Sequence, residues 1–312
     1  MQIRIPPELR TVTKTVVPIT GIDKAPKLEH HDPSNIIHYG DRYYLWFTEH
    51  LSVELGNDGF RDTYLKLATS TNGLHWQVQG IALDKGEPGA PDEKGVLTSY
   101  IVPAEGKWYL FHLAVGPQFT DPQHSRRGLW VAEADTPDGP WHKRYEAPVL
   151  WPGEDGAWDE LCCDDPNVIY RDGQWWLYYK GRRNGSNPMD SYIGLATSDS
   201  ITGPYTKHPA NPLMTGHAAS VWNHRHGVAA VGGEVDTPAN SCVRWSEDGV
   251  HFVEAGVFPN KSTGFYQEDV GRLGNQDAES PGVRWGFDVV RRLRPRYIYR
   301  FDCSMRVPDE DS

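Results

Sequence analysis

The chain has 312 residues, and 42 Asp and Glu outnumber 31 Lys and Arg to give a formal net charge of −11. An acidic surface repels a phosphate backbone, which argues against a nucleic-acid partner. No run of about 18 apolar residues is present, so we expect no membrane partner, and the first residues lack the apolar core of a secretion signal. We therefore expect a cytoplasmic protein, or a periplasmic one if a signal has been removed.

Composition favours an all-β fold. The chain has 12 Trp, 15 Tyr and 9 Phe, together with 31 Gly and 24 Pro. Short aromatic runs separated by turn residues are typical of strands and hairpins, and long segments of helical period are absent. The four cysteines show no CxxC spacing, so we expect buried, reduced thiols rather than a zinc or redox site. They are Cys162, Cys163, Cys242 and Cys303.

Two patterns alternate along the chain. The first is a glycine turn followed by an aromatic strand, at 40–47, 106–111 and 173–179, in which Leu45, Leu110 and Leu177 recur at steps of 65 and 67 residues. The second is an apolar strand, a turn ending in glycine and an aromatic residue. Its copies lie at 67–76, 131–141, 195–205 and 243–252. Such turns supply the positive φ angles of tight hairpins.

These repeats predict a five-bladed β-propeller. Each copy contains about four strands, which is the content of one blade. A fourth, shortened aromatic copy lies at 226–231 and a fifth blade at about 283–303. We predict one domain over 1–312, with residues 1–25 either pairing with the last blade or forming a loose arm. A β-sandwich would not explain the repeat of about 65 residues.

The candidate catalytic residues follow from the repeat, because the first strand of each propeller blade lines the central channel. Thirteen residues before Leu45 and Leu177 lie Asp32 and Asp164. The same step in blade two gives Leu97, beside Thr98, and in the shortened fourth copy it gives His217. Two carboxylates and a histidine are thus predicted to converge on one mouth of the channel.

This set suits glycosidic bond cleavage, which needs a proton donor on one side of the bond and a carboxylate on the other. Asp32 fits the base or nucleophile, Asp164 a supporting role, and His217 the acid, since imidazole titrates near neutral pH. Asp165 is the alternative to Asp164, because Asp165 shares the Asp-Pro pairing of Asp32.

Further substrate contacts are expected around these three residues. The predicted binding residues are His31, Thr98, Asp165, Arg182 and Trp222. Arg182 can hold a hydroxyl or a carboxylate, and Trp222 is one of several tryptophans that can stack on a sugar. We expect no cofactor, although a structural or site cation is left open. The histidines that would supply a metal site show no firm ligand spacing. These are His30, His31, His224 and His226.

Taken together, several motifs resemble glycoside hydrolase family 117. They are His31-Asp-Pro-Ser-Asn-Ile-Ile37, Asp164-Asp-Pro-Asn-Val-Ile169, Trp176-Leu-Tyr-Tyr-Lys-Gly-Arg182, Gly216-His-Ala-Ala-Ser-Val-Trp222, and Trp285-Gly-Phe with Arg300-Phe-Asp-Cys303. The resemblance implies an exo-acting α-1,3-(3,6-anhydro)-L-galactosidase with an inverting mechanism, in which Asp32 is the base, Asp164 assists and His217 is the acid. This chain departs from the family pattern at Ala218, where Glu is usual. A homodimer is a further expectation, which the short segment before Asp32 weakens.

Two alternatives stand beside this hypothesis. One is an arabinanase- or xylosidase-type propeller with a glutamate as acid, for which Glu160 and Glu268 are the candidates. The other is a non-catalytic propeller that binds sugars, for which binding would survive the loss of Asp32. In each case the expected partner is an oligosaccharide.

Overall fold

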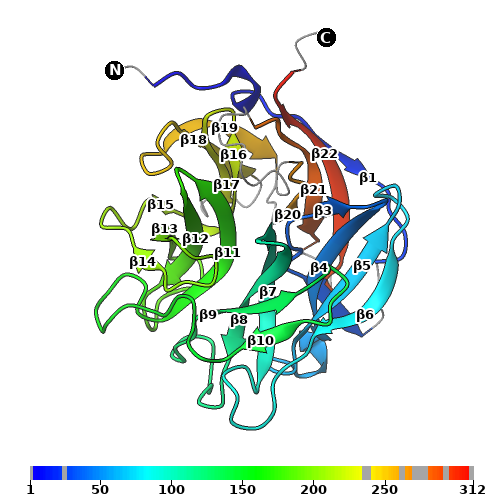
Figure 1. The fold of residues 1–312 in the computed structure, drawn as a ribbon, viewed down its shortest axis with the longest axis vertical. Helices are drawn as coiled ribbons and strands as arrows, with labels where there is room; N and C mark the ends of the chain where they lie inside the picture. The colour runs from blue at the N-terminus through cyan, green and yellow to red at the C-terminus, as the bar shows by residue number, and fades with distance from the viewer. Residues whose placement is uncertain are drawn as a thin grey trace.

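The computed structural model describes residues 3–22, 27–233, 240–259, 264–268, 280–290 and 295–308. They form five antiparallel sheets arranged as blades around a central axis, which confirms the predicted five-bladed propeller (Figure 1). Short 3-10 turns lie at η1 (Pro7–Leu9) and η2 (Val53–Leu55). None of the helical segments in the described ranges has the length and apolar character needed to cross a membrane.

Each blade is a meander of strands that runs outward from the axis. Blade one contains β2 (Leu28–His31), β3 (Ile37–Tyr39), β4 (Arg42–Leu51), β5 (Tyr64–Ser70) and β6 (Gln77–Leu83). Blade two contains β7 (Gly95–Ala104), β8 (Lys107–Val115), β9 (Leu129–Ala134) and β10 (His142–Arg144). Blade three contains β11 (Cys162–Arg171), β12 (Gln174–Arg182), β13 (Ser191–Ser198), β14 (Thr206–Lys207) and β15 (Met214–Thr215). Blade four contains β16 (His217–His224), β17 (Gly227–Gly233), β18 (Asn240–Ser246) and β19 (Val253–Pro259).

Blade five combines both ends of the chain. Its strands are β20 (Gly264–Phe265), β21 (Gly282–Val289), β22 (Ile298–Arg306) and β1 (Lys14–Val17). The N-terminal segment therefore pairs with the last blade, one of the two arrangements predicted for it. The blade also begins earlier than the predicted 283, because its innermost strand β20 has only two residues and leaves no periodic signal in the sequence.

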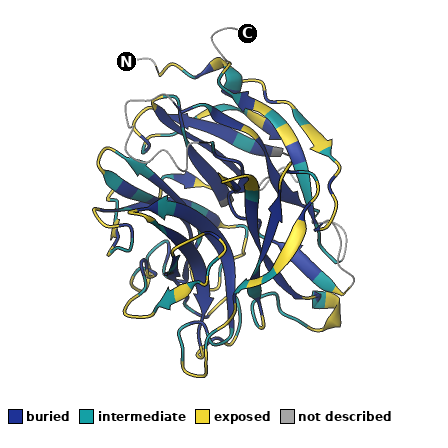
Figure 2. Cartoon of the chain, turned by 45° about the vertical axis from the view of Figure 1, so that its right-hand side comes forward, coloured by how far each residue is buried: buried dark blue, intermediate teal, exposed yellow. Residues whose placement is uncertain are grey.

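The turns and the core explain why these segments form blades. Glu105-Gly106 and Asp172-Gly173 both have positive φ at the two central positions, the geometry of a type I′ hairpin. Apolar side chains gather in clusters between neighbouring blades, such as the one that joins Val102 and Phe111 of blade two to Leu177 of blade three. Figure 2 shows buried residues along the strands and exposed ones mainly in loops and on outer strands.

His112 on β8 predicts that the protein loses stability in mild acid. Its side chain is fully buried, neither ring nitrogen has a hydrogen-bond partner, and burial lowers its pKa to about 4. Between pH 6.5 and 4 the unfolded chain binds a proton at this site that the native protein does not, so stability rises with pH over that window. The full effect is about 3 kcal/mol.

This prediction is tested by urea unfolding at pH 7 and pH 4.5. The variant His112→Leu should lose less stability than the parent between the two pH values, whereas the control His142→Leu, at an exposed position, should lose as much as the parent. An equal loss in the parent and His112→Leu would show that His112 does not carry the acid sensitivity.

Candidate active site

Three residues near the start of the inner strands share an unusual backbone conformation. Asp32, Thr98 and Asp165 have φ of 48°, 43° and 49°. Left-handed φ is uncommon outside glycine, is a genuine outlier for a β-branched residue, and clusters at functional sites. These three residues therefore share one backbone conformation at equivalent positions in blades one, two and three.

This equivalence changes the alignment of blade three. The pairing of β11 with β12 shifts between Asp164 and Asn167, and that of β7 with β8 between Leu97 and Ser99. Asp165, not Asp164, consequently occupies the position equivalent to Asp32. Counting residues along the chain favoured Asp164, because a bulge inserts a residue without any mark in the sequence.

The same three residues line a cavity at the centre of the propeller, to which blades one to four contribute. Its walls are Asp32, Pro33, Asn35, Thr98, Ser99, Tyr100, Asp165, Pro166, Asn167 and Ala219. The two carboxylates of the set, Asp32 and Asp165, are close enough for the charge of Asp32 to act on Asp165. Carboxylates of blades one and three thus converge on one cavity, and Asp165 is less deeply buried than Asp164.

His31 holds the carboxylate of Asp32. The Nδ1 atom of His31 lies 2.6 Å from Asp32 Oδ2 and donates to it, while its ring packs edge-on against His50 at 4.8 Å. Burial and the neighbouring His31 lower the pKa of His50 to about 4, so His50 is neutral at physiological pH. His31 is thus placed to orient the carboxylate of Asp32.

Lys180 joins the two carboxylates of blade three. Its Nζ lies 3.1 Å from Asp164 Oδ2 and 2.6 Å from Asp165 Oδ2. Asp164 Oδ1 also accepts from Thr98 Oγ1 at 3.0 Å and from the Asp165 amide at 2.8 Å. Asp164 is therefore occupied by protein donors, whereas Asp165 faces the cavity.

The pKa values of Asp164 and Asp165 are shifted in opposite directions. Burial raises the pKa of Asp164, but Lys180 and Arg127 outweigh it and bring the pKa below the usual value. Burial raises the pKa of Asp165, the charge of Lys180 opposes this, and the charges of Asp164 and Asp32 leave the pKa well above the usual value. Asp164 is therefore the member of the pair that favours the ionised form, and Asp165 is the member that more readily holds a proton.

His217 begins β16, the inner strand of blade four, and is half-buried. Its Nδ1 lies 2.7 Å from the carbonyl of Pro188 and 3.5 Å from Ser191 Oγ, so Nδ1 carries the proton that bonds the carbonyl. The β16–β17 pairing shifts between His217 and Ala219, which gives His217 the position of Asp164. The cavity lining includes Ala219, two residues further along the strand, but not His217.

Of the five predicted binding residues, three lie in or against the cavity, as described above. They are His31, Thr98 and Asp165. Trp222 does not: its side chain is 1% exposed and packs on Phe265 in the core between blades four and five, so it offers no face to a sugar. This corrects the prediction, which could not separate an inward tryptophan from a core tryptophan. Arg182 is buried and donates to the Pro122 carbonyl at 2.8 Å.

Neither glutamate considered as an alternative acid is arranged as a proton donor. Glu160 accepts backbone N–H groups from Gly156 and Asn184, which lower its pKa and keep it ionised. Glu268 forms an ion pair with Arg284 at 2.9 Å. The ring of His217, in contrast, contacts the neutral Pro188 carbonyl and the Ser191 hydroxyl.

No group of three or more His, Cys, Asp or Glu side chains within the described residues is arranged to hold a metal ion. Two of the histidines considered as ligands are paired with carboxylates. His30 Nε2 lies 2.8 Å from Glu49, and His224 Nε2 lies 2.8 Å from Glu8 on the N-terminal segment.

Sequence reasoning missed the residues that hold the site together. Asn35 and Asn167 each exchange hydrogen bonds with the inner strand of the next blade, Asn35 with both backbone groups of Ile101 and Asn167 with Ala219 and Val221. An Asn two or three residues after the Asp of each Asp-Pro pair was the available signal. Lys180 was also missed, although its spacing from Arg182 places both side chains on one face of β12.

Comparisons with known proteins place the chain among the glycoside hydrolases. The family model described as glycosyl hydrolases family 43 matches residues 26–192. A family 117 glycoside hydrolase from the marine bacterium Zobellia galactanivorans is 26% identical, with a TM-score of 0.84 over 97% of this chain and 93% of that one. This likeness confirms the resemblance to family 117.

Two further relatives are more distant. A probable arabinan endo-1,5-α-L-arabinosidase C from Neosartorya fischeri is 28% identical over 53% of this chain, which spans 59% of that relative's length. A family 43 enzyme from Xanthomonas citri, solved with xylose, is 14% identical with a TM-score of 0.60 over 89% of this chain and 88% of that one, a likeness of fold alone.

Proposed function

The chain belongs to glycosyl hydrolases family 43, as the match over more than half its length shows, and we propose that it is an exo-acting glycoside hydrolase that removes a terminal α-linked sugar from an oligosaccharide. The observation that carries this proposal is the pairing of Asp32 and Asp165 across one cavity. The full-length likeness to a family 117 enzyme supports 3,6-anhydro-L-galactose or a related sugar as the leaving unit.

In the proposed mechanism, Asp32 is the general base. Its carboxylate, held by His31, takes a proton from the water that attacks the anomeric carbon, and inversion of configuration follows from direct attack. His217 gives a proton to the departing glycosidic oxygen. Its Nδ1 proton is held by the Pro188 carbonyl, so the transferable proton sits on Nε2.

We assign the assisting role to Asp165 in place of Asp164. Asp165 lines the cavity, and Lys180 and Asp164 hold it from behind. With its raised pKa it can donate a hydrogen bond to a sugar hydroxyl or accept one. Asp164 acts through Lys180 and Thr98 and is a positioning residue.

The substrate and the acid are tested together by incubating the protein with a neoagaro-oligosaccharide and separating the products by chromatography. We expect release of a single anhydro-sugar from the non-reducing end. His217→Gln should slow this release by about 10²–10⁴-fold, the usual contribution of a general acid. Glu160→Gln is the matched control and should retain the parental rate. Loss of activity in Glu160→Gln with retention in His217→Gln would overturn the assignment of the acid.

An arabinan-degrading activity is the second candidate, because the relative from Neosartorya fischeri is described as an arabinosidase and matches half of this chain. Debranched arabinan is the probe. Release of arabinose or arabino-oligosaccharides, with none from the neoagaro-oligosaccharide, would replace the anhydro-sugar proposal and leave the roles of Asp32 and Asp165 to be tested on arabinan.

A further inference from the structure

A second cavity lies at the end of the central channel that faces away from the candidate active site. It measures about 240 Å³ and is formed by residues of blades one, two and five. Strand β7 reaches both places, because Thr98 near its start lines the candidate active site and Pro103 near its end lines the second cavity. Strand residues rise by about 3.3 Å each, so these two positions are roughly 16 Å apart. The second cavity is therefore distinct from the site that contains Asp32 and Asp165.

A buried hydrogen bond spans the channel between the two cavities. The hydroxyl of Tyr100, which lines the candidate active site, donates at 2.9 Å to Oε1 of Gln267, which lines the second cavity. Gln267 Nε2 in turn donates to the Val221 carbonyl of blade four at 3.4 Å. Tyr100 is 3% exposed and Gln267 is 6% exposed. A ligand in the second cavity is thus separated from Asp32 by this pair of side chains.

The wall of the second cavity carries an exposed aromatic ring. Tyr39 ends β3 and is 49% exposed. Its ring packs edge-on against Trp108 of the same wall at 5.2 Å, which holds it in place. Tyr266, also in the wall, stacks on Trp285 at 5.0 Å, and Tyr43 packs edge-on against both. Aromatic rings held in this way offer flat contact area at a low cost in side-chain entropy.

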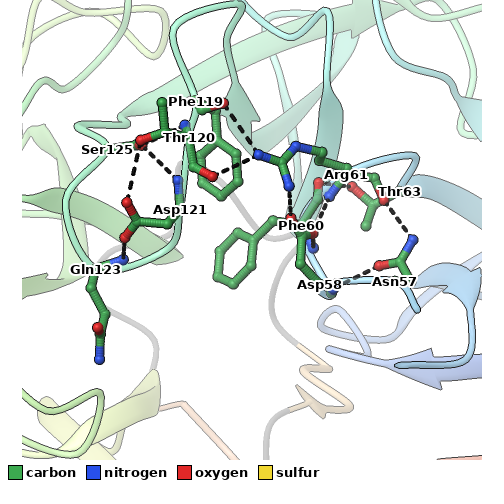
Figure 3. A network of polar contacts seen from close by, with 11 residues as sticks. Asn57, Asp58, Phe60, Arg61, Thr63, Phe119, Thr120, Asp121, Gln123 and Ser125 are labelled. Atoms are coloured by element: carbon green, nitrogen blue, oxygen red, sulfur yellow. Dashed lines mark hydrogen bonds and ion pairs between the residues drawn. The ribbon is translucent and has the colours of Figure 1, made fainter. Parts of the chain in front are cut away.

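The aromatic rings beside the candidate active site are arranged differently. At the start of β7, Phe60 stacks on Phe119 at 5.6 Å, and Arg61 lies over the Phe119 ring at 5.1 Å. Arg61 also donates to the carbonyls of Phe119 and Thr120 in the next blade (Figure 3). Phe119 is therefore covered by protein and only 5% exposed, whereas about half of Tyr39 is open to a ligand.

A third cavity adjoins the second between blades one and five. It measures about 340 Å³ and is lined by Tyr43, Asn72, Arg284, Trp285, Arg300 and Asp302. Tyr43 packs against Tyr266 of the second cavity at 5.5 Å, and Arg284 lies over the same Tyr266 ring at 5.8 Å. The two cavities are thus neighbours on either side of Tyr266. We call them together the far-face groove.

The charged side chains of the far-face groove are paired with one another. Arg284 Nε lies 2.9 Å from Glu268 Oε1, and Arg300 Nη2 lies 2.9 Å from Asp302 Oδ1. Each arginine is therefore balanced by a carboxylate, so the lining favours neither an anion nor a cation. The side chains of Arg284 and Asp302 are still 48% and 51% exposed, and they present donors and acceptors beside the aromatic rings. A neutral ligand with hydroxyl groups and apolar faces matches this lining.

We propose that the far-face groove is a second, non-catalytic binding site for a neutral glycan chain. The C–H face of one sugar ring lies on Tyr39, and hydroxyl groups of the chain bond the exposed ends of Arg284 and Asp302. Ligand pockets usually measure about 300–1,000 Å³, so a chain of a few sugar units occupies both cavities. The inference goes beyond the proposed function, because binding here needs no hydrolysis at Asp32. It gives the protein a hold on a polymer that is independent of the candidate active site.

The test is affinity electrophoresis in native polyacrylamide gels cast with low-gelling agarose or with debranched arabinan. Asp32→Asn is used throughout, so that the polysaccharide is not hydrolysed, and we expect at least one of the two polymers to retard it. Adding Tyr39→Ala should raise the dissociation constant by about 2–10-fold, the contribution of one aromatic contact. Arg284→Met, in the third cavity, should also weaken the retardation. Ile81→Ala is the matched control, because Ile81 is 50% exposed on β6 of the same blade as Tyr39.

Two results would overturn the proposal. One is a mobility that neither polysaccharide changes. The other is equal retardation with and without Tyr39→Ala and Arg284→Met, provided that thermal unfolding shows both variants to be folded. The outcome is separable from that of the proposed function. A parent protein that hydrolyses a glycan but is retarded by neither polymer contradicts this inference alone. Retardation that Tyr39→Ala weakens, in a protein that hydrolyses no glycan, contradicts the proposed function alone.

Discussion

Asp32→Asn is expected to leave the propeller folded and to reduce hydrolysis by about 10²–10⁴-fold, the contribution of a general base. Asparagine tolerates left-handed φ, so the backbone at φ 48° is retained. Its amide oxygen can still accept from His31 Nδ1. The substitution therefore removes the proton acceptor and little else.

The measurement is the initial rate of product release, followed by chromatography, together with a thermal unfolding curve. Asp41→Asn provides the control, because Asp41 is a solvent-exposed carboxylate in the same blade. An unchanged midpoint with a rate reduced at least a hundredfold supports the base assignment. A rate within tenfold of the parent would show that Asp32 does not take the proton, and Asp165 would become the carboxylate to test.

Much of the fold follows from the sequence because its signal is periodic. The aromatic strands at 40–47, 106–111 and 173–179 became β4, β8 and β12, the second strand of three successive blades. Each pairs with an inner strand and buries apolar residues against the next blade. Blade five escaped full prediction, since its first strand is two residues long and its outermost strand comes from the other end of the chain.

The site was predicted less completely, for a different reason. Asp32, Thr98 and His217 emerged from a count along the chain, but a bulge makes Asp165, not Asp164, the residue of blade three that faces the cavity. Bulges depend on backbone geometry that one sequence does not reveal. Arg127, whose charge acts on Asp164, was invisible to the motif search because it lies in a loop before β9.

Lys180→Met tests how the blade-three carboxylates are held. Removing the ammonium group leaves Asp164, which is buried and ionised, without its ion-pair partner, and breaking a buried pair in this way costs about 3–5 kcal/mol of unfolding free energy. Lys107→Met is the matched control. Its ion pair with Glu133 is exposed to solvent, so its loss should cost less than about 1 kcal/mol.

The pH dependence of this loss identifies the charge state of the pair. In the parent, Lys180 helps to hold the pKa of Asp164 below its usual value, so the stability gained is present above pH 4 and disappears as the pH falls and the carboxyl is protonated. In Lys180→Met the buried carboxyls would have raised pKa values, and the deficit should grow from pH 4 to pH 7. Urea unfolding at both pH values measures it. A deficit of the same size at both would mean that Lys180 contributes packing rather than charge.

The double variant of Lys180→Met with Asp165→Asn shows which carboxyl carries the charge. A deficit that grows with pH in Lys180→Met but vanishes in the double variant would locate the charge on Asp165. Asp165 would then assist hydrolysis as an anion and not as a hydrogen-bond donor.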